Sequence, residues 1–293
     1  MINEFLKEYI EYIENEIDRL FPPISDCGYS KVCDAARYSL TLGGKRIRPI
    51  IVLEFCKLLG GKKEDAINFA VALEMIHTYS LIHDDLPCMD NDDMRRGKPS
   101  CHIKFQEDTA LLAGDTLLTE AFGVMSKADI PSERIVKAVE FLSGLSGLHG
   151  MIGGQVLDLQ FETEKPDSKQ LIDMYSRKTS GLLIAASTLG CIAAGNFDNE
   201  TLENAKNYGK DLGIAFQIID DILDCTADEK LLGKPVGSDD KNDKTTFVSI
   251  YGIEKSRNIA KKYTNSAIKA LSSFCGDKEN LLALTEYLLK RKY

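Results

Sequence analysis

The sequence lacks the excess of positive charge that a nucleic-acid-binding protein needs. Its 293 residues carry 36 Lys and Arg against 45 Asp and Glu, a formal net charge of −9. Because the nucleic-acid backbone attracts basic surfaces, this balance argues against a nucleic-acid partner. An acidic protein that binds an anionic ligand must instead gather its few cations locally or recruit a metal ion.

The cysteine and histidine spacings of zinc sites are also missing. None of the eight cysteines forms a Cys-x-x-Cys pair, and the four histidines complete no zinc-binding spacing. In a reducing compartment such cysteines act as small apolar residues. We therefore expect a cytoplasmic protein with reduced thiols.

No hydrophobic run is long enough to predict a membrane span. The longest run, residues 181–195, is shorter than the ~20 residues that cross a bilayer. It is rich in Ala and Gly, which favours a tightly packed interior helix. The N-terminal residues 1–8 are charged throughout and do not resemble a signal peptide.

Helical periodicity dominates the chain, and the period-two alternation of strands is nearly absent. A first helix is expected to end at Pro22-Pro23, and another to open at Pro49. Further helices are predicted at about residues 30–42, 65–83, 106–126, 132–148, 151–162, 168–195, 199–224, 254–272 and 279–291. No low-complexity linker divides the chain. Residues 1–293 are therefore predicted to form one all-α domain, a large helical bundle around a central apolar cavity.

Two groups of aspartates each follow an apolar helical run. They are Asp84, Asp85 and Asp90 in the first group and Asp220, Asp221 and Asp224 in the second. Acidic side chains are rarely buried unless they are paired or bind a cation. Oxygen-rich, histidine-poor ligation suits Mg²⁺, which proteins hold with a few carboxylates and substrate phosphates. The pattern predicts a magnesium site shared by both groups at the mouth of the cavity.

The spacing inside the first group requires a break in the helix. His77 and Asp84 are seven residues apart and share a helix face. Asp90 could not join Asp84 on a regular helix, because six residues turn the chain by about 240°. Pro87 interrupts the helix, and residues 86–99 are predicted to form a charged surface loop that folds Asp90 back.

Basic residues accompany the aspartates. They are Lys45 with Arg48, Arg95 with Arg96, Lys178, and Lys234 with Lys244. A solvated surface would explain any one of these groups, or an aspartate group alone. The combination favours an anion site, because Arg makes forked contacts to phosphate and Lys acts as a point charge.

With these motifs in this order, the chain resembles a trans-isoprenyl diphosphate synthase, most closely those of bacteria that make farnesyl diphosphate. The matching segments are residues 43–49 (GGKRIRP), 84–90 (DDLPCMD), 95–97 (RRG), 153–155 (GGQ), 178–179 (KT), 216–224 (FQIIDDILD) and 233–239 (GKPVGSD). They span most of the chain, and their joint occurrence is specific to the family.

The resemblance implies a role for each matching residue. Asp84 and Asp90 would bind two Mg²⁺ and Asp220 a third, with Asp85, Asp221 and Asp224 in support. Contacts to the allylic diphosphate would come from Arg95, Lys178, Thr179, Gln217, Lys234 and Lys244. Isopentenyl diphosphate would be bound by Lys45, Arg48, His77 and Arg96. Catalysis would rest on Asp84, Asp220 and Lys178, and the family further implies a homodimer.

Product length is expected to depend on Tyr79 and Ser80. On a helix, Tyr79 lies five residues, or about 7.5 Å, before Asp84. In the family an aromatic side chain at this place fits a C15 product, because it would form the floor of the prenyl pocket. Four residues separate Asp85 from Asp90, the longer bacterial spacing. Both features favour farnesyl diphosphate, made from dimethylallyl and geranyl diphosphates with isopentenyl diphosphate.

Several alternatives remain at this point. A geranylgeranyl or geranyl diphosphate synthase differs only in pocket depth. A terpene cyclase would leave Lys45, Arg48 and His77 without a role. A non-catalytic synthase subunit would be expected to lose an aspartate motif, and both are present. A metal-buffering helical protein would leave the basic residues unexplained.

Overall fold

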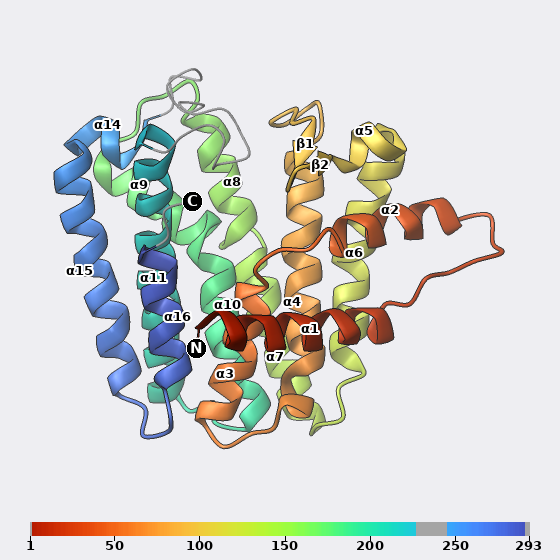
Figure 1. Ribbon diagram of the computed structural model, residues 1–293, viewed down its shortest axis with the longest axis horizontal. Coiled ribbons are helices and arrows are strands. Elements are labelled where there is room, and N and C mark those ends of the chain that lie inside the picture. Colours follow the sequence, from red (N-terminus) through yellow and green to blue (C-terminus); the bar gives the residue numbers. More distant parts are fainter. Residues whose placement is uncertain (1, 227–244, 291–293) are drawn as a thin grey trace.

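The computed structural model describes residues 2–226 and 245–290. Helices make up 76% of the described chain (Figure 1). They are α1 (Ile2–Leu20), α2 (Ser30–Leu40), α3 (Ile47–Leu58), α4 (Lys63–Asp84), α5 (Cys101–Phe105), α6 (Glu107–Ser126), α7 (Ser132–Ser146), α8 (Met151–Gln160), α9 (Ser168–Lys178), α10 (Ser180–Ala194), α11 (Asn199–Thr226), α14 (Phe247–Tyr251), α15 (Ile253–Ser272) and α16 (Glu279–Lys290). The predicted all-α bundle is confirmed.

The single helix predicted over residues 168–195 is wrong, because the chain breaks at Thr179 between α9 and α10. The Thr179 hydroxyl donates to Gln217 of α11, and the Ser180 hydroxyl donates to the Lys210 carbonyl oxygen at 3.0 Å. Hydroxyl side chains that bond outside their own turn compete with regular helix geometry. The break turns the end of α9, with Lys178, toward a cavity.

The predicted surface loop at residues 86–99 contains a small hairpin that sequence periodicity did not reveal. Its strands are β1 (Met94–Arg95) and β2 (Lys98–Pro99), too short for an alternating pattern. Arg96 and Gly97 between them both have positive φ, as two-residue hairpin turns of this twist require. The turn presents the adjacent Arg95 and Arg96 near the end of α4.

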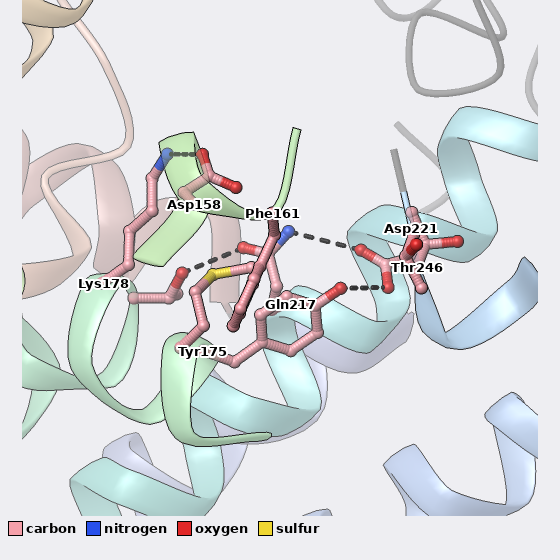
Figure 2. A pocket seen from close by; sticks show the side chains of 10 residues that line it. Asp158, Phe161, Tyr175, Lys178, Gln217, Asp221 and Thr246 are labelled. Atoms are coloured by element: carbon pink, nitrogen blue, oxygen red, sulfur yellow. Dashed lines mark hydrogen bonds and ion pairs between the residues drawn. The ribbon is translucent and has the colours of Figure 1, made fainter. Parts of the chain in front are cut away.

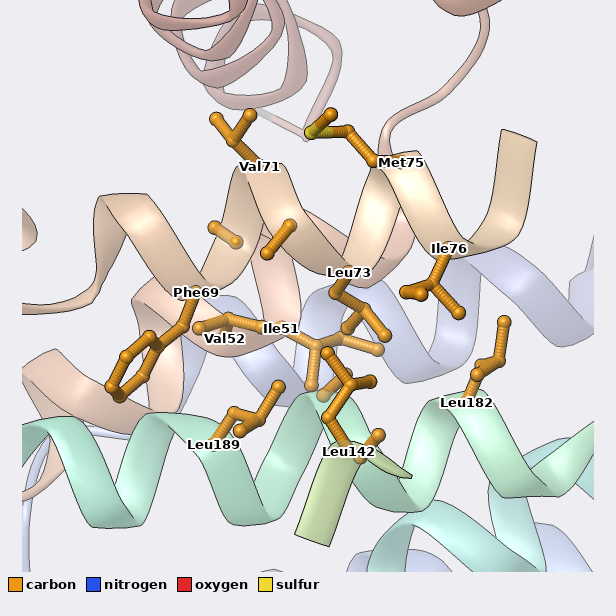
Figure 3. Close-up of a cluster of buried hydrophobic side chains, with 14 of the residues drawn as sticks. Ile51, Val52, Phe69, Val71, Leu73, Met75, Ile76, Leu142, Leu182 and Leu189 are labelled. Atoms are coloured by element: carbon orange, nitrogen blue, oxygen red, sulfur yellow. The ribbon is translucent and has the colours of Figure 1, made fainter. Parts of the chain in front are cut away.

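The main core surrounds α4, which is packed by α3, α6 and α10. Figure 3 shows Ile51 and Val52 of α3 meeting Leu73 of α4 and Leu189 of α10. Each such aliphatic side chain, fully buried, stabilises the fold by about 1.5–3 kcal/mol. A second cluster joins α9, α11, α14 and α15 around residues such as Phe247.

The carboxyl ends of α4 and α11 lie at the same end of the bundle (Figure 1). These are the ends that carry the two aspartate groups. The fold therefore brings together, at one end, motifs that are more than a hundred residues apart in the sequence.

By length and composition alone, one stretch of the described chain, Ser132–Gln160, could cross a membrane, and 28% of its apolar window is buried. Buried helices of other proteins meet the same criteria, so this is weak evidence for a span. The structure divides the stretch into α7 and α8, with a turn at residues 147–150. This stretch differs from the apolar run at residues 181–195, which forms the buried core helix α10.

Close approach of α10 to α3 gives a stability prediction. An added Cβ at Gly190 would lie 2.5 Å from both Phe55 Cβ and the Val52 carbonyl oxygen. Gly190→Ala is expected to lower the free energy of unfolding by about 1–3 kcal/mol, since an overpacked core must shift. Urea unfolding followed by circular dichroism measures this change.

Gly144→Ala on α7 is the matched control, because an added Cβ there meets nothing within 4 Å. It should raise the free energy of unfolding by up to about 1 kcal/mol through helix propensity. Equal stability of the two variants would contradict the packing argument.

Candidate functional site

The first aspartate group lies where α4 ends. The last helical residue is Asp84, and the chain then turns so that the Asp90 amide donates to the Asp84 carbonyl oxygen at 2.9 Å. The Met89 amide also donates back, to the Leu86 carbonyl oxygen. The break expected at Pro87 is thereby confirmed, and it brings Asp90 next to Asp84.

Burial disfavours the ionised form of the Asp84 carboxyl group. Burial raises the pKa of Asp84 to about 6, nearby Lys178 and Arg95 act against this rise, and Asp90 and Asp85 add to it. A carboxyl in this position is poised to accept a cation, because a positive charge favours its ionised form.

Asp85 already has a cationic partner. It is almost fully buried, and Arg95 Nε lies 3.0 Å from its Oδ1 and 3.2 Å from its Oδ2. The guanidinium also reaches Asp92 at 3.3 Å. In this arrangement Asp85 positions Arg95, which lies at the base of the hairpin, and Arg95 contributes positive charge near Asp84.

A cluster of arginines surrounds His77. Burial and the neighbouring guanidinium groups of Arg48, Arg96, Arg46 and Arg95 hold the pKa of His77 well below its ordinary range. The imidazole is therefore neutral at physiological pH. Such a concentration of cations in a net acidic protein is typical of an anion site.

The turn before α3 and the hairpin contact each other. Arg96 donates a hydrogen bond to the Gly43 carbonyl oxygen, and an added Cβ at Gly44 would lie 2.8 Å from Arg96 Cζ. Glycine at both places lets the backbone adopt positive φ and approach the guanidinium. The contact joins two basic groups that are separated by about fifty residues in the sequence.

Arg46 has a structural role that sequence reasoning did not identify, and its partner Glu74 was missed. Arg46 is buried and left-handed in backbone conformation, and its Nη1 lies 2.8 Å from Glu74 Oε1. Its Nη2 donates to the Leu40 carbonyl oxygen at 2.7 Å. Arg46 points inward, whereas Arg48 faces the cavity with a buried Nε that has no hydrogen-bond partner among residues 2–226 and 245–290.

The second aspartate group is organised by Asp221 (Figure 2). The buried carboxylate accepts hydrogen bonds from the Tyr175 hydroxyl at 2.7 Å, from Gln217 Nε2 at 3.3 Å and from the Phe247 amide at 3.1 Å. Gln217 in turn accepts from the Thr179 hydroxyl at 2.9 Å. This network ties α9, α11 and α14 together. Tyr175 was missed because nothing in its local sequence marks it.

Lys178 forms an ion pair with Asp158 of α8, at 2.6 Å between Nζ and Oδ2 (Figure 2). Asp158 was not among the predicted residues, although it lies three residues after the Gly153-Gly154-Gln155 motif. An added Cβ at Gly154 would lie 2.2 Å from the backbone nitrogen of Lys178, so glycine there lets α8 approach α9. The pair holds the ammonium group near the cavity.

Two cavities meet at Lys178 and Thr179. The larger, about 480 Å³, extends from Asp84 between α4, α6 and α8. Its lining includes Arg48, His77, Tyr79, Ser80, Leu118, Ile152, Gln155, Val156, Leu159 and Leu182. The smaller, about 140 Å³, is lined by Gln217 and Asp221. Charged groups thus surround the opening of an apolar pocket.

Most of the predicted site residues are brought to this end of the bundle. Asp220 is half-buried and Asp224 buried at the end of α11. Lys45 is exposed, with its Nζ 5.5 Å from the centroid of the Tyr287 ring. Lys234 and Lys244 lie outside the described residues, so their predicted contacts stay predictions.

The donor set fits magnesium. Within residues 2–226 and 245–290, no three His, Cys, Asp or Glu side chains are grouped closely enough to hold a metal ion alone. Carboxylate oxygens are ligands that Mg²⁺ prefers, and a magnesium site typically combines one or two of them with waters and substrate phosphates. Asp84 and Asp90 would supply oxygen ligands on one side, and Asp220 would supply them on the other.

Comparison with known proteins identifies the family. A family model described as polyprenyl synthetase matches residues 30–284. A farnesyl diphosphate synthase of Micrococcus luteus is 44% identical over 262 residues, 89% of this chain and 90% of that protein. A heterodimeric geranylgeranyl pyrophosphate synthase large subunit of Arabidopsis thaliana is 45% identical over 270 residues, 89% of this chain and 72% of that protein.

Solved structures agree. A geranyltransferase from Helicobacter pylori, complexed with magnesium and isoprenyl diphosphate, is 34% identical and superposes with a TM-score of 0.84 over 97% of this chain and 98% of that chain. Match length, identity and fold all lead to the same assignment. The chain belongs to the polyprenyl synthetase family and is an isoprenyl diphosphate synthase.

Proposed function

We propose that the enzyme is a (2E,6E)-farnesyl diphosphate synthase. It condenses isopentenyl diphosphate head-to-tail with dimethylallyl diphosphate and then with geranyl diphosphate. The observation that carries this product is Tyr79, a bulky and buried side chain that lines the same cavity as Asp84. A chain that grows from the diphosphate site into the pocket meets this ring.

The reaction begins when the C1–O bond of the allylic diphosphate breaks and its electron pair leaves with diphosphate. The π electron pair of the isopentenyl diphosphate double bond then forms the new carbon–carbon bond to C1. A proton is lost from the carbon next to the new cation, and the departed diphosphate accepts it. No side chain of the chain is assigned as the base.

Residues at the junction of the two cavities bind the leaving diphosphate. Lys178 and Thr179 lie at the break between α9 and α10, and Arg95 lies at the base of the hairpin. Asp84, Asp90 and Asp220 would hold magnesium, which when bound neutralises negative charge on the diphosphate as it leaves. Lys178 must exchange Asp158 for the diphosphate when substrate binds.

Isopentenyl diphosphate is assigned to the arginine cluster. Arg48 and Arg96 present guanidinium groups to the second diphosphate, and Lys45 adds a point charge. Neutral His77 can donate one hydrogen bond there without adding charge. The apolar walls of the cavity, such as Leu182 of α10, keep water from the allylic cation.

Tyr79 supports a C15 product over a C20 product. It is about 5% exposed, so the ring occupies space in the wall of the pocket. Relatives named for farnesyl and for geranylgeranyl products are equally similar to this chain, so overall identity does not separate the two activities. A geranylgeranyl diphosphate synthase is the second candidate, favoured by the number of relatives with that name.

We also propose that the enzyme acts as a homodimer in the cytoplasm. Exposed apolar side chains lie on α6, on α7 and in the turn after α7: Leu111, Leu112, Val136 and Leu148. A monomer would leave this surface in water, and a second copy would cover it. The cysteines of the described chain are free thiols, which fits a reducing compartment.

A product assay tests the proposed function. With Mg²⁺, dimethylallyl diphosphate and labelled isopentenyl diphosphate, mass spectrometry should find farnesyl diphosphate as the main product. EDTA should abolish product formation, and added Mg²⁺ should restore it, because the carboxylates and phosphates repel each other without the metal. A main product of C20 would replace the farnesyl assignment by the geranylgeranyl one.

Tyr79→Ala is expected to shift the main product from C15 to C20, because the chain can then extend past the missing ring. Product lengths are measured under the same conditions as for the wild type. Tyr29→Ala, which removes an exposed tyrosine between α1 and α2, is the control and should leave the product unchanged. Unchanged C15 from Tyr79→Ala would refute the pocket floor.

Leu112→Glu is expected to weaken the dimer, since it places a charge in the apolar surface of α6. Light scattering after gel filtration should give twice the 32.5 kDa chain mass for the wild type and a single chain mass for the variant. Ile24→Glu changes an exposed isoleucine elsewhere and should remain dimeric. A monomeric wild type would disprove the proposed assembly.

A further inference from the structure

We propose that Gly114 of α6 helps to set product length by seating the His83 ring against Tyr79. This inference rests on the proposed function, because it takes Tyr79 as the floor of the prenyl pocket. It assigns a specificity-determining role to a residue that lies on a second helix, outside both aspartate motifs.

Gly114 provides the space in which the His83 imidazole lies. An added Cβ at this position would be 2.0 Å from His83 Nε2 and 2.4 Å from His83 Cδ2. Both distances are far shorter than heavy atoms reach without a bond. Gly114 is buried in the contact between α4 and α6, so a larger residue there must displace the ring.

His83 connects α6 to the pocket floor. Its Nε2 lies 3.1 Å from the Leu111 carbonyl oxygen and 3.9 Å from Asp115 Oδ1, both on α6. The other side of the ring packs edge-to-face on Tyr79, with ring centroids 5.7 Å apart and planes at 78°. His83 and Tyr79 are one turn apart on α4, and both line the larger cavity.

Tyr79 depends on this packing for its position. Its hydroxyl is buried and has no hydrogen-bond partner within the described residues. The ring is therefore held by its neighbours and not by a polar anchor. His83 is one such neighbour. Its ring contacts Tyr79 edge-to-face, and aromatic pairs of this geometry are favourable.

The test compares product distributions of variants on both sides of the contact. His83→Ala should raise the share of C20 product by about five-fold, roughly the loss of one aromatic contact. In His83→Ala/Gly114→Ala, the added methyl group occupies part of the vacated space, and the C20 share should return at least halfway to the wild-type value. Gly114→Ala alone pushes the ring toward the pocket and should raise the share of C10 product.

Gly123→Ala is the matched control on the same helix. An added Cβ there meets only Glu120 Oε2, at an ordinary contact distance of 3.5 Å. It has the same gain in helix propensity as Gly114→Ala and should leave the product distribution unchanged. If Gly114→Ala and Gly123→Ala give the same products, the proposal is overturned.

Two further measurements separate this contact from other roles of His83. His83→Gln keeps a donor for the Leu111 carbonyl oxygen but lacks the ring, so it should also lengthen the product, and a wild-type distribution would overturn the proposal. In a Tyr79→Ala background, His83→Ala should cause no further lengthening. An additional shift there would show that His83 does not act through Tyr79.

All these readouts are shifts relative to the wild-type enzyme. A wild-type product of C20 would therefore overturn the farnesyl assignment, while the contact would still predict lengthening beyond C20 in His83→Ala. Wild-type C15 with no shift in His83→Ala and His83→Gln would overturn the contact and leave the farnesyl assignment intact.

Discussion

Carboxylates at the carboxyl ends of two buried helices impose the main electrostatic constraint on this structure. The carboxyl end of a helix already has partial negative charge, and Asp84 adds a half-buried carboxylate there. Burial raises the pKa of Asp84 to about 6, and the neighbouring carboxylates of Asp90 and Asp85 add to this rise. Cations must therefore gather at this end of the bundle, and Lys178, the hairpin arginines and the expected magnesium ions meet that requirement.

The structure divides these charges between internal pairs and groups that face the cavity. Arg46 is matched by Glu74, Arg95 by Asp85, and Lys178 by Asp158. A buried charge without a partner would cost several kcal/mol, so such pairs can hold the surrounding side chains in one arrangement. In the part of the chain that the structure describes, Arg48 has a buried nitrogen without a hydrogen-bond partner and thus retains capacity to bind an anion.

The apolar half of the site depends on close approach between helices. Small residues let α8 reach Lys178 and let α6 reach His83, as Gly154 and Gly114 show. The pocket between these helices has a volume of about 480 Å³, and Tyr79 limits its depth in our proposal. The same few contacts between helices therefore determine both where the charges lie at the opening and how the walls of the pocket pack.

By itself the sequence determined the all-α class, the ends of most helices and the chemical types of the site residues. It did so because helix periodicity, Pro and Gly are local signals, and because the aspartate and basic motifs are contiguous. The fold-back of Asp90 could also be predicted, since Pro87 must interrupt α4. The break at Thr179 could not, because the Thr179 hydroxyl that supports it donates to Gln217, 38 residues away. Only the tertiary structure decided which charges pair, since Asp158, Tyr175 and Glu74 acquire their roles from contacts across helices.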